Sequence, residues 1–243
     1  MTGGMDTAII ARSVRIPAGT RQLNADLRLP ERPRGLAVFV NSSGSGRLDA
    51  DRLLVPRYLE GRGYATLLVD LLTMGEEASD LRSGRYHLNV PFMAERICLT
   101  LIWIRRQPDL RTLPIALIGG EAAGGAAMVA AAAHPDRIRG VISMSGRPDL
   151  AEDALRDVHI PVLLIAGARD THVVDCNLEA LTQLHGARLD IVDGAGTMMH
   201  GEGGVARAAR DAADWLDDFV AASQPLCLPQ LIPLPQEAAV HHI

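Results

Sequence analysis

The chain has 243 residues, of which 48% are hydrophobic and 22% are charged, and its formal net charge is −5 at pH 7. This length fits one α/β domain or two small ones, and the apolar fraction is enough for a sizeable core. No apolar run approaches the roughly 18 residues of a membrane span. Basic residues form no stripe and only 3% of residues are aromatic, which argues against nucleic acid as a partner. We therefore expect a protein without membrane or nucleic-acid partners that binds a small molecule.

The cysteines and the N-terminal residues bear on the compartment. Cys98, Cys176 and Cys227 are odd in number, widely spaced and without the spacing of a metal site. The first ten residues, MTGGMDTAII, lack the basic and apolar blocks of a secretory signal. We interpret the cysteines as reduced thiols of a cytoplasmic protein, and we expect neither a metal nor a cofactor.

The predicted elements begin with an antiparallel hairpin, in which Val14–Ile16 and Ala25–Leu29 flank a Pro-Ala-Gly-Thr turn. Short continuous apolar runs follow, as expected for strands that are buried on both faces. These runs are Leu36–Val40, Ala65–Val69, Pro114–Gly119, Gly140–Met144, Pro161–Ala166 and Ala187–Val192. Helix-like segments lie at 50–62, 91–107, 121–133, 175–185 and 203–222. Strands that alternate with helices predict an α/β fold with a mostly parallel central sheet flanked by helices.

Two segments depart from this alternation. Residues 73–90 are charged and irregular, and they could be either a lid over the site or a plain surface loop. Residues 223–243 carry four prolines without a helical period, which predicts an extended tail. The leucines of this tail could instead pack on a neighbouring subunit, so a homodimer is a further expectation. We predict one domain over residues 1–222.

Polar residues gather in the loops that follow the predicted strands. Ligands of open parallel sheets bind beyond the carboxyl ends of the strands, so these loops are the candidate site. The loops are Asn41–Arg47, Asp70–Gly75, Gly120–Gly125, Ser145–Asp149, Gly167–Thr171 and Asp193–His200.

The stretch from Ile115 to Met128, IALIGGEAAGGAAM, is the most informative part of the chain. A strand runs into a glycine-rich turn and then into a helix of small residues. Such a turn could cradle a phosphate, or it could be a nucleophile elbow that lifts one side chain over the sheet. The phosphate interpretation is weaker, because the turn has no Lys-Ser/Thr pair and its glycines do not match G-x-G-x-x-G. The next strand also ends in Ser-Met-Ser, without an acid for a ribose.

Several phrases of the chain, from about residue 14 to residue 220, resemble the dienelactone-hydrolase-like branch of the α/β-hydrolase superfamily. They are Val14-Arg-Ile-Pro-Ala-Gly, Ala65-Thr-Leu-Leu-Val-Asp-Leu-Leu-Thr, Gly146-Arg-Pro-Asp-Leu-Ala, Pro161-Val-Leu-Leu-Ile-Ala-Gly-Ala-Arg-Asp, Val192-Asp-Gly-Ala and Ala212-Ala-Asp-Trp. The resemblance implies the α/β-hydrolase fold. It also implies an elbow of the form G-x-S-x-G, which here becomes Gly119-Gly120-Glu121-Ala122-Ala123. A glutamate therefore takes the place of the serine.

The same resemblance gives positions to the remaining catalytic groups. The acid of the triad falls on Asp170. The histidine falls on Thr197, and His200 lies three residues further along the chain. The His-Gly pair of the oxyanion loop becomes Asn41-Ser42, which Ser43 follows. The resemblance therefore predicts an atypical member of the family that lacks the Ser-His-Asp triad.

These substitutions argue against ordinary ester hydrolysis. Glu121 supplies no hydroxyl, and two negative charges about 4 Å apart repel by roughly 4 kcal/mol at an effective dielectric constant near 20, so an ionised Glu121 would destabilise an oxyanion. A glutamate in an apolar pocket can move protons, whereas the helix N-terminus favours its ionised form, and the sequence leaves this balance open.

Three hypotheses of function follow. The first is cofactor-independent isomerisation, epimerisation or cyclisation of a small-molecule or peptide-like substrate through Glu121, since members of this fold without the triad resemble such enzymes of natural-product pathways. The second is hydrolysis of an ester or lactone by unusual machinery, and the third is ligand binding without catalysis. Glu121 could also merely cap its helix. The candidate catalytic residues are Glu121, Asp170 and His200, and the candidate substrate-binding residues are Asn41, Ser42, Ser43, Ala122, Arg147 and Thr197.

Overall fold

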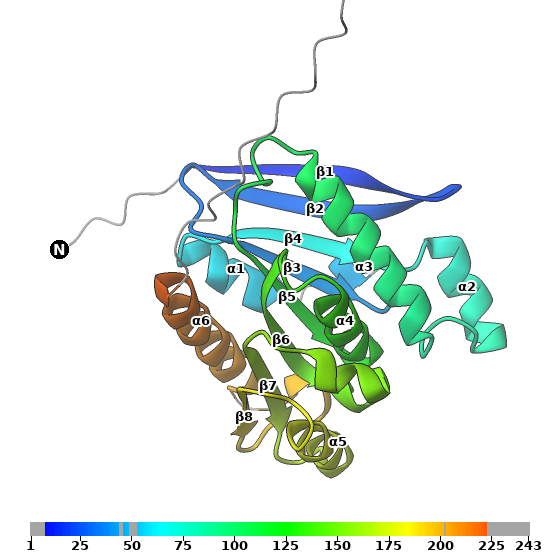
Figure 1. The fold of residues 1–243 in the computed structure, drawn as a ribbon, viewed down its shortest axis with the longest axis vertical. Helices are drawn as coiled ribbons and strands as arrows, with labels where there is room; N and C mark the ends of the chain where they lie inside the picture. Colours follow the sequence, from blue (N-terminus) through cyan, green and yellow to red (C-terminus); the bar gives the residue numbers. More distant parts are fainter. Residues whose placement is uncertain (1–7, 44–45, 49–52, 202, 223–243) are drawn as a thin grey trace, which may run out of the picture.

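The structure, a computed structural model, describes residues 8–43, 46–48, 53–201 and 203–222. One eight-stranded sheet with the strand order β1-β2-β4-β3-β5-β6-β7-β8 runs through the molecule (Figure 1). Its strands are β1 (Ile9–Ala18), β2 (Arg21–Pro30), β3 (Leu36–Asn41), β4 (Ala65–Asp70), β5 (Ile115–Gly120), β6 (Ile138–Gly146), β7 (Val162–Gly167) and β8 (Ala187–Val192). The tail expected at 223–243 lies outside the described residues.

The antiparallel part of the sheet is the N-terminal hairpin. β1 pairs with β2 over their whole lengths, and β2 pairs antiparallel with β4. In β2, inward residues such as Leu23 and Leu27 are buried and alternate with more exposed ones, which is the period of a strand with one covered face. The hairpin is longer than the sequence predicted, because this alternation continues beyond the apolar runs. From β4 through β3, β5, β6 and β7 to β8, each strand is parallel to the next one in the sheet, so the predicted mostly parallel sheet is confirmed.

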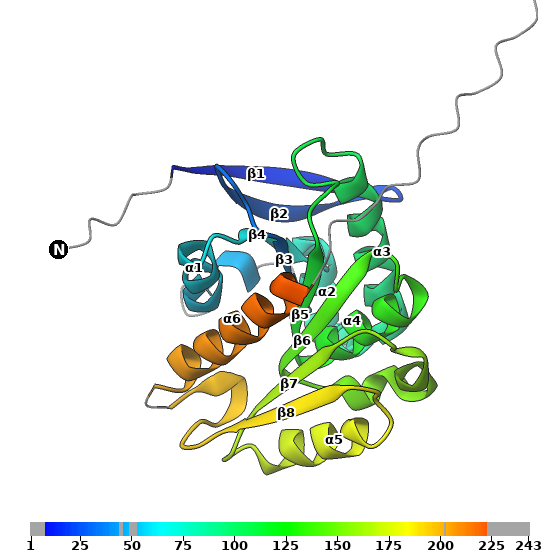
Figure 2. The ribbon, with the colours of Figure 1, turned by 60° about the vertical axis from the view of Figure 1, so that its left-hand side comes forward.

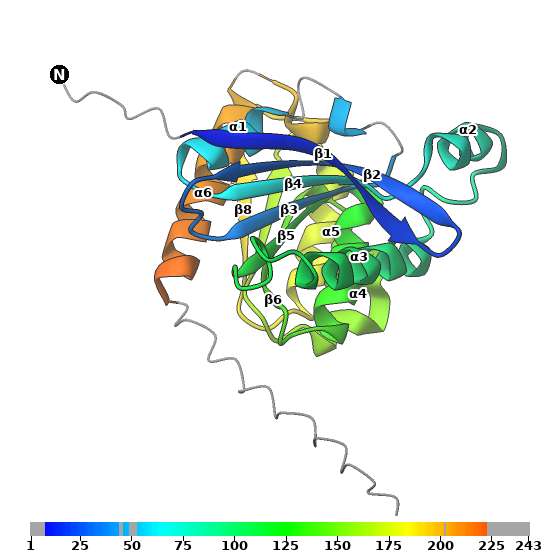
Figure 3. The ribbon, with the colours of Figure 1, turned by 90° about the horizontal axis from the view of Figure 1, so that it is seen from above.

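Helices cover both faces of the parallel strands (Figures 2 and 3). They are α1 (Leu54–Gly61), α2 (Met74–Ser83), α3 (Val90–Arg105), α4 (Glu121–Ala133), α5 (Thr171–Leu181) and α6 (Gly204–Ala222), with 3-10 segments η1 (Gly46–Leu48), η3 (Pro148–Asp157) and η4 (Thr197–Met199). α3 and α4 pack on one face, and α1 and α6 pack on the other. None of these helices is long and apolar enough to cross a membrane, as far as the described residues go.

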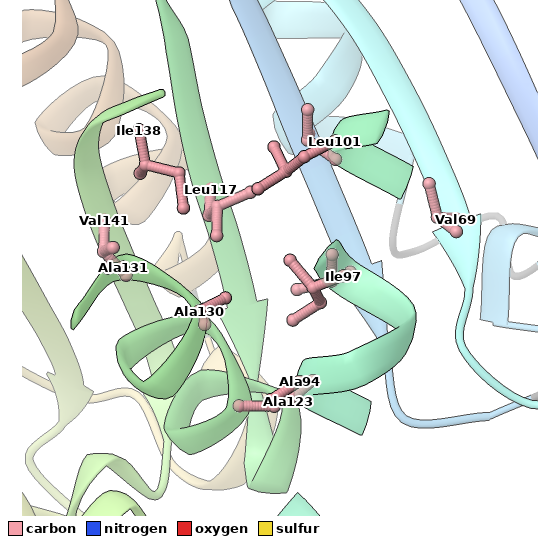
Figure 4. Close-up of a cluster of buried hydrophobic side chains, with 14 of the residues drawn as sticks. Val69, Ala94, Ile97, Leu101, Leu117, Ala123, Ala130, Ala131, Ile138 and Val141 are labelled. Atoms are coloured by element: carbon pink, nitrogen blue, oxygen red, sulfur yellow. The ribbon is translucent and has the colours of Figure 1, made fainter. Parts of the chain in front are cut away.

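The core is divided by the sheet into two apolar clusters. Figure 4 shows part of the larger cluster, in which Ile97 of α3 and Ala130 of α4 lie over Leu117 of β5. The run of alanines in α4 lets this helix lie close to the sheet. On the other face, the ring of Trp215 occupies the space beside Gly140 of β6, where an added Cβ would lie 2.6 Å from the ring. Both clusters include residues of β5, so the two layers pack on opposite faces of the same strand.

Two helical segments and one helix boundary differ from the sequence-based expectation. The segment 73–90 contains the helix α2, none of whose residues is buried. α5 begins at Thr171, four residues earlier than predicted, because the Asp170 side chain accepts a hydrogen bond from the Val173 N–H and caps the helix. The 3-10 segment η3 was not predicted, since its apolar residues are few.

Candidate functional site

The turn between β5 and α4 is a strained elbow with Glu121 at its apex. Glu121 has φ +49°, a left-handed conformation that is unfavourable for a residue with a Cβ. The glycine before it in β5 is required by space, because a Cβ on Gly119 would lie 2.7 Å from the Ala123 carbonyl oxygen. The sequence therefore folds here as the glycine pattern predicts, and residue 121 is lifted above the carboxyl ends of the strands.

The Glu121 side chain is exposed and accepts a hydrogen bond from the loop that follows β3. Ser42 Oγ donates a hydrogen bond to Glu121 Oε2 at 3.1 Å. The Glu121 backbone carbonyl accepts a hydrogen bond from the Arg147 N–H at 2.8 Å, and Glu121 forms a parallel bridge with Gly146. The carboxylate also lies at the N-terminus of α4, where the helix dipole stabilises negative charge. Backbone contacts thus fix the elbow, and Ser42 fixes the carboxylate.

A cavity of about 150 Å³ lies beside the elbow. Most of its wall is apolar, with Phe39, Ile118 and three methionines among the lining residues. The lining residues are Phe39, Val40, Asn41, Val55, Ile118, Gly119, Gly120, Met144, Ser145, Met198, Met199, His200 and Val205. They come from the carboxyl ends of β3, β5 and β6, from η4, and from α1 and α6. The set includes Gly120 but not Glu121, so the glutamate stands at the border of the cavity.

Asn41 and His200 are the two predicted site residues that line the cavity. The Asn41 side-chain amide lies 3.5 Å from Asp70 Oδ1. Asp70 is fully buried, and this burial raises its pKa to about 6 although Arg47 and Asn41 oppose the shift. His200 is exposed and follows η4. The structure thus brings one amide and one imidazole to the same cavity.

The other predicted residues do not line the cavity. Asp170 caps α5, and Thr197 is exposed at the start of η4. The Arg147 guanidinium is held by Asp149, with Nε and Nη2 at 2.8 and 2.6 Å from its carboxylate oxygens. Ala122 is buried in the first turn of α4. No residue of 73–90 lines the cavity, so a lid role for that segment stays a prediction.

Ser43 is another predicted residue that does not line the cavity. Its Oγ is buried and makes no hydrogen bond within the described part of the chain. Its backbone carbonyl accepts a hydrogen bond from the Leu72 N–H at 3.2 Å. Ser43 therefore helps to fix the loop after β3, from which Ser42 reaches Glu121.

Sequence reasoning missed Ser145 and the methionines of the cavity wall. Ser145, Met198 and Met199 have φ values of +47°, +55° and +63°. Both loops that contain them were identified from their position after a strand. Neither methionine nor serine, however, predicts a positive φ. Within the described residues, no group of three or more His, Cys, Asp or Glu side chains could hold a metal ion.

Comparisons with known proteins bear on the family. No protein-family model matches the chain. Two strains of Mycobacterium tuberculosis contain a protein named "Putative phosphoribosyl transferase" that is 37% identical to this chain over 221 residues. The match covers 90% of this chain and 49% of each relative, so the chain spans about half the length of these relatives.

Solved structures match over nearly their whole lengths. A dienelactone hydrolase from Anabaena variabilis is 35% identical and superposes with a TM-score of 0.82, covering 86% of this chain and 98% of that chain. Est1E from Butyrivibrio proteoclasticus is 16% identical, with a TM-score of 0.73 over 86% of this chain and 99% of that chain. A dienelactone hydrolase-like promiscuous phosphotriesterase from metagenomic libraries is also 16% identical, with a TM-score of 0.68 over 87% of this chain and 99% of that chain.

Proposed function

Because this chain belongs to the dienelactone-hydrolase family of α/β-hydrolase-fold proteins, we propose that it is an atypical member that acts through Glu121 by proton transfer. The reaction would be an isomerisation, epimerisation or cyclisation of a small molecule, in keeping with a role in natural-product biosynthesis. The observation that carries the proposal is the carboxylate at the strained elbow, held by Ser42 beside an apolar cavity.

The elbow is unsuited to acyl transfer. A serine triad needs a hydroxyl at the elbow and a histidine that takes its proton. Residue 121 is a glutamate, and the position that the family resemblance assigns to the histidine is Thr197. The negative charge of Glu121 would also repel a developing oxyanion, by roughly 4 kcal/mol at about 4 Å and an effective dielectric constant near 20. These are reasons to expect no covalent acyl-enzyme.

The elbow is better suited to a base. Glu121 keeps a left-handed backbone although the strain costs on the order of 1–3 kcal/mol, and such strain is concentrated at functional sites. Ser42 orients the Glu121 side chain through its hydrogen bond, and a positioned carboxylate can accept a proton from a substrate. The apolar wall of the cavity would exclude water from a substrate's C–H group.

A general probe of carboxylate bases tests this role. In 5-nitrobenzisoxazole, removal of one C–H proton by a base opens the ring by breaking its N–O bond. We expect the wild-type chain to catalyse this reaction and Glu121→Gln to lower kcat/KM by about 100-fold, the usual contribution of a general base. Glu179→Gln, on the exposed face of α5, is the matched control and keeps the wild-type rate. Equal rates for wild type and Glu121→Gln would contradict the proposal.

Hydrolysis by Glu121, Asp170 and His200 is the second candidate, and the observation that favours it is His200 in the cavity wall. The test is p-nitrophenyl acetate. Under the first proposal the wild-type chain does not hydrolyse this ester, whereas the double variant Glu121→Ser with Thr197→His, which restores the family's groups, gains hydrolysis. Wild-type hydrolysis that is lost in His200→Ala would favour the second candidate. Binding of either probe without turnover would indicate a ligand-binding protein instead.

We do not extend the phosphoribosyl transferase name of the mycobacterial relatives to this chain. Those proteins are about twice as long as the matched region. In this chain the helix N-terminus that could bind a pyrophosphate carries Glu121 in its first turn, and a carboxylate there repels a phosphate.

A homodimer in the cytoplasm is part of the same proposal. Sedimentation velocity of the full chain over a tenfold range of concentration tests the oligomeric state, because a dimer in exchange with its monomer changes its mean sedimentation coefficient with concentration. A monomer at every concentration would contradict the dimer.

A further inference from the structure

The side chain of Met198 reaches the cavity wall close to the elbow. Met198 lines the cavity, and its terminal methyl carbon Cε would lie 4.0 Å from a Cβ added to Gly120. Gly120 also lines the cavity and immediately precedes Glu121. The end of this long side chain therefore lies beside the turn that carries the carboxylate, and a ligand that approaches the elbow has to share the space with it.

Packing in the core accounts for the neighbouring methionine but not for Met198. Met199 is only 1% exposed and belongs to the apolar cluster under α1 and α6, together with Val192 and Ala195. Met198 is half-buried, and among the described residues it belongs neither to that cluster nor to the cluster under α3 and α4. Its backbone has φ +55°, which glycine would adopt without strain. The Met198 side chain is thus part of the cavity wall and not of the core.

Backbone contacts hold η4 in place without the side chain of Met198. The Gly196 N–H donates a hydrogen bond to the His200 carbonyl at 2.7 Å, and the Met199 N–H donates one to the Gly196 carbonyl at 3.1 Å. η4 also lies against the start of α6, because a Cβ added to Gly204 would overlap the Met199 carbonyl oxygen. A shorter side chain at position 198 should therefore leave the conformation of this loop intact.

We propose that Met198 sets the upper size limit of the ligand that reaches Glu121. The strands β3, β5 and β6 supply Phe39, Ile118 and Met144 to the rest of the wall, and the cavity has a volume of about 150 Å³. A dry apolar cavity of about this volume holds benzene in another protein. The reacting part of the substrate is therefore an apolar group about as large as one six-membered ring, and Met198 excludes a second, fused ring.

This inference rests on the proposed function and names the substrate class for it. Glu121 accepts the proton, and Met198 determines which molecules can present a C–H group to it. A hydrophobic pocket discriminates between ligands by the space that it leaves, and a difference of one methylene group already changes the preference measurably. Shortening the side chain at position 198 should therefore admit larger ligands without affecting the carboxylate.

Phenol and 2-naphthol test the size limit, because they share a hydroxyl group and differ by one fused ring. The dissociation constant of each is measured by calorimetric titration, and polar contacts of the hydroxyl cancel in the ratio of the two constants. We expect wild type to bind phenol more tightly than 2-naphthol. Met198→Ala should lower the ratio of the 2-naphthol constant to the phenol constant by about tenfold. Met198→Leu, which nearly conserves the volume, should keep the wild-type ratio.

Met128→Ala is the matched control, because Met128 of α4 is fully buried in the cluster on the other face of the sheet. This variant should unfold at least about 5 °C below wild type and keep the ratio, whereas Met198→Ala should unfold within about 3 °C of wild type. An unchanged ratio in Met198→Ala would overturn the proposal. So would a wild-type chain that binds 2-naphthol as tightly as phenol, or that binds neither. Glu121→Gln should keep the ratio, so failure of the base and failure of the size limit give different results.

Discussion

At the scale of single residues, backbone strain is concentrated at the elbow and in the wall of the cavity. The described residues include five non-glycine positions with positive φ. Four of them, Glu121, Ser145, Met198 and Met199, lie at the elbow or in the cavity wall, and the fifth is Glu152 in η3. Each costs on the order of 1–2 kcal/mol, and such residues persist where the surrounding structure and the function require them.

The strain at Glu121 predicts a reversal of the usual order of alanine and glycine. In a helix, glycine is less stable than alanine by about 1 kcal/mol. At position 121 the left-handed backbone should make Glu121→Gly more stable than Glu121→Ala by about 1 kcal/mol, since both variants lose the Ser42 contact equally. Urea unfolding measures this difference. At Glu179, which has a helical backbone in α5, the ordinary order should hold, and the same order at both positions would argue against strain at the elbow.

Some of these residues were predictable and others were not. The glycine-rich turn after a strand and the family resemblance together identified the elbow, and Glu121 follows from laying G-x-S-x-G on Gly119 to Ala123. The sign of φ at Ser145 was not predictable, because serine adopts extended and helical backbones in most contexts. Whether Thr197 or His200 would reach the site was also uncertain, because the sequence does not predict the positive φ values in η4. η4 turns sharply through Met198 and Met199, and so brings His200 to the cavity wall.

At the scale of elements, α2 shows where sequence reasoning fails. A helix is recognised by an apolar face, and α2 has no buried residue, so its sequence has no period to detect. The capping box in which Thr73 and Glu76 satisfy each other's backbone N–H groups was the available signal. Arg96 of α3 then holds Glu76 with two hydrogen bonds of 2.7 Å, which fixes the start of α2 against the core. The parallel strands were predictable because both of their faces are buried.

The end of β4 predicts a fall in stability with rising pH. Burial raises the pKa of Asp70 from 3.8 to about 6 despite the hydrogen bonds from Arg47. The folded state therefore binds a proton more tightly than the unfolded state, and this contribution is lost as pH rises from about 4 to 6. We expect the free energy of unfolding of wild type, minus that of Asp70→Asn, to fall by up to roughly 3 kcal/mol over this range. Urea unfolding at each pH measures it, and a flat difference would contradict the burial argument.

Glu76, at the start of α2, predicts that stability rises with pH, and it does so at lower pH values than those for Asp70. Burial alone would raise the pKa of Glu76, but hydrogen bonds from Arg96 and Thr73 outweigh it and lower the pKa from 4.5 to about 2. The stabilisation is present above pH 4.5 and is lost as pH falls towards 2. The difference between wild type and Glu76→Gln should therefore grow with pH up to about 4.5 and stay constant from there to pH 7. Growth of this difference above pH 5 would show that another group is responsible.

At the scale of the whole molecule, one sheet separates two helical layers, α3 with α4 on one face and α1 with α6 on the other. The alternation of apolar runs with helix-like stretches predicted this architecture, and the fold confirms it. β5 shows the physical reason, because Leu117 faces the cluster under α3 and α4 whereas Ile118 belongs to the cluster under α1 and α6. We therefore expect a substitution in one cluster to affect the packing of the other cluster through the shared strands.

The two tryptophans of the chain report the two layers separately. Trp103 packs against the cluster of α3 and α4, and Trp215 packs against the cluster of α1 and α6. If the described residues form one domain, Trp103→Phe and Trp215→Phe each leave one reporter, and the fluorescence and far-ultraviolet circular dichroism of each variant should follow one urea transition. Leu117→Ala, a cavity substitution in the first cluster, should lower the free energy of unfolding by about 2–5 kcal/mol in both backgrounds. In one cooperative unit, the loss of packing on one face of the sheet lowers the midpoint reported from both faces. An unchanged urea midpoint in the Trp215 signal would therefore mean that α1 and α6 unfold independently of the layer beneath Trp103.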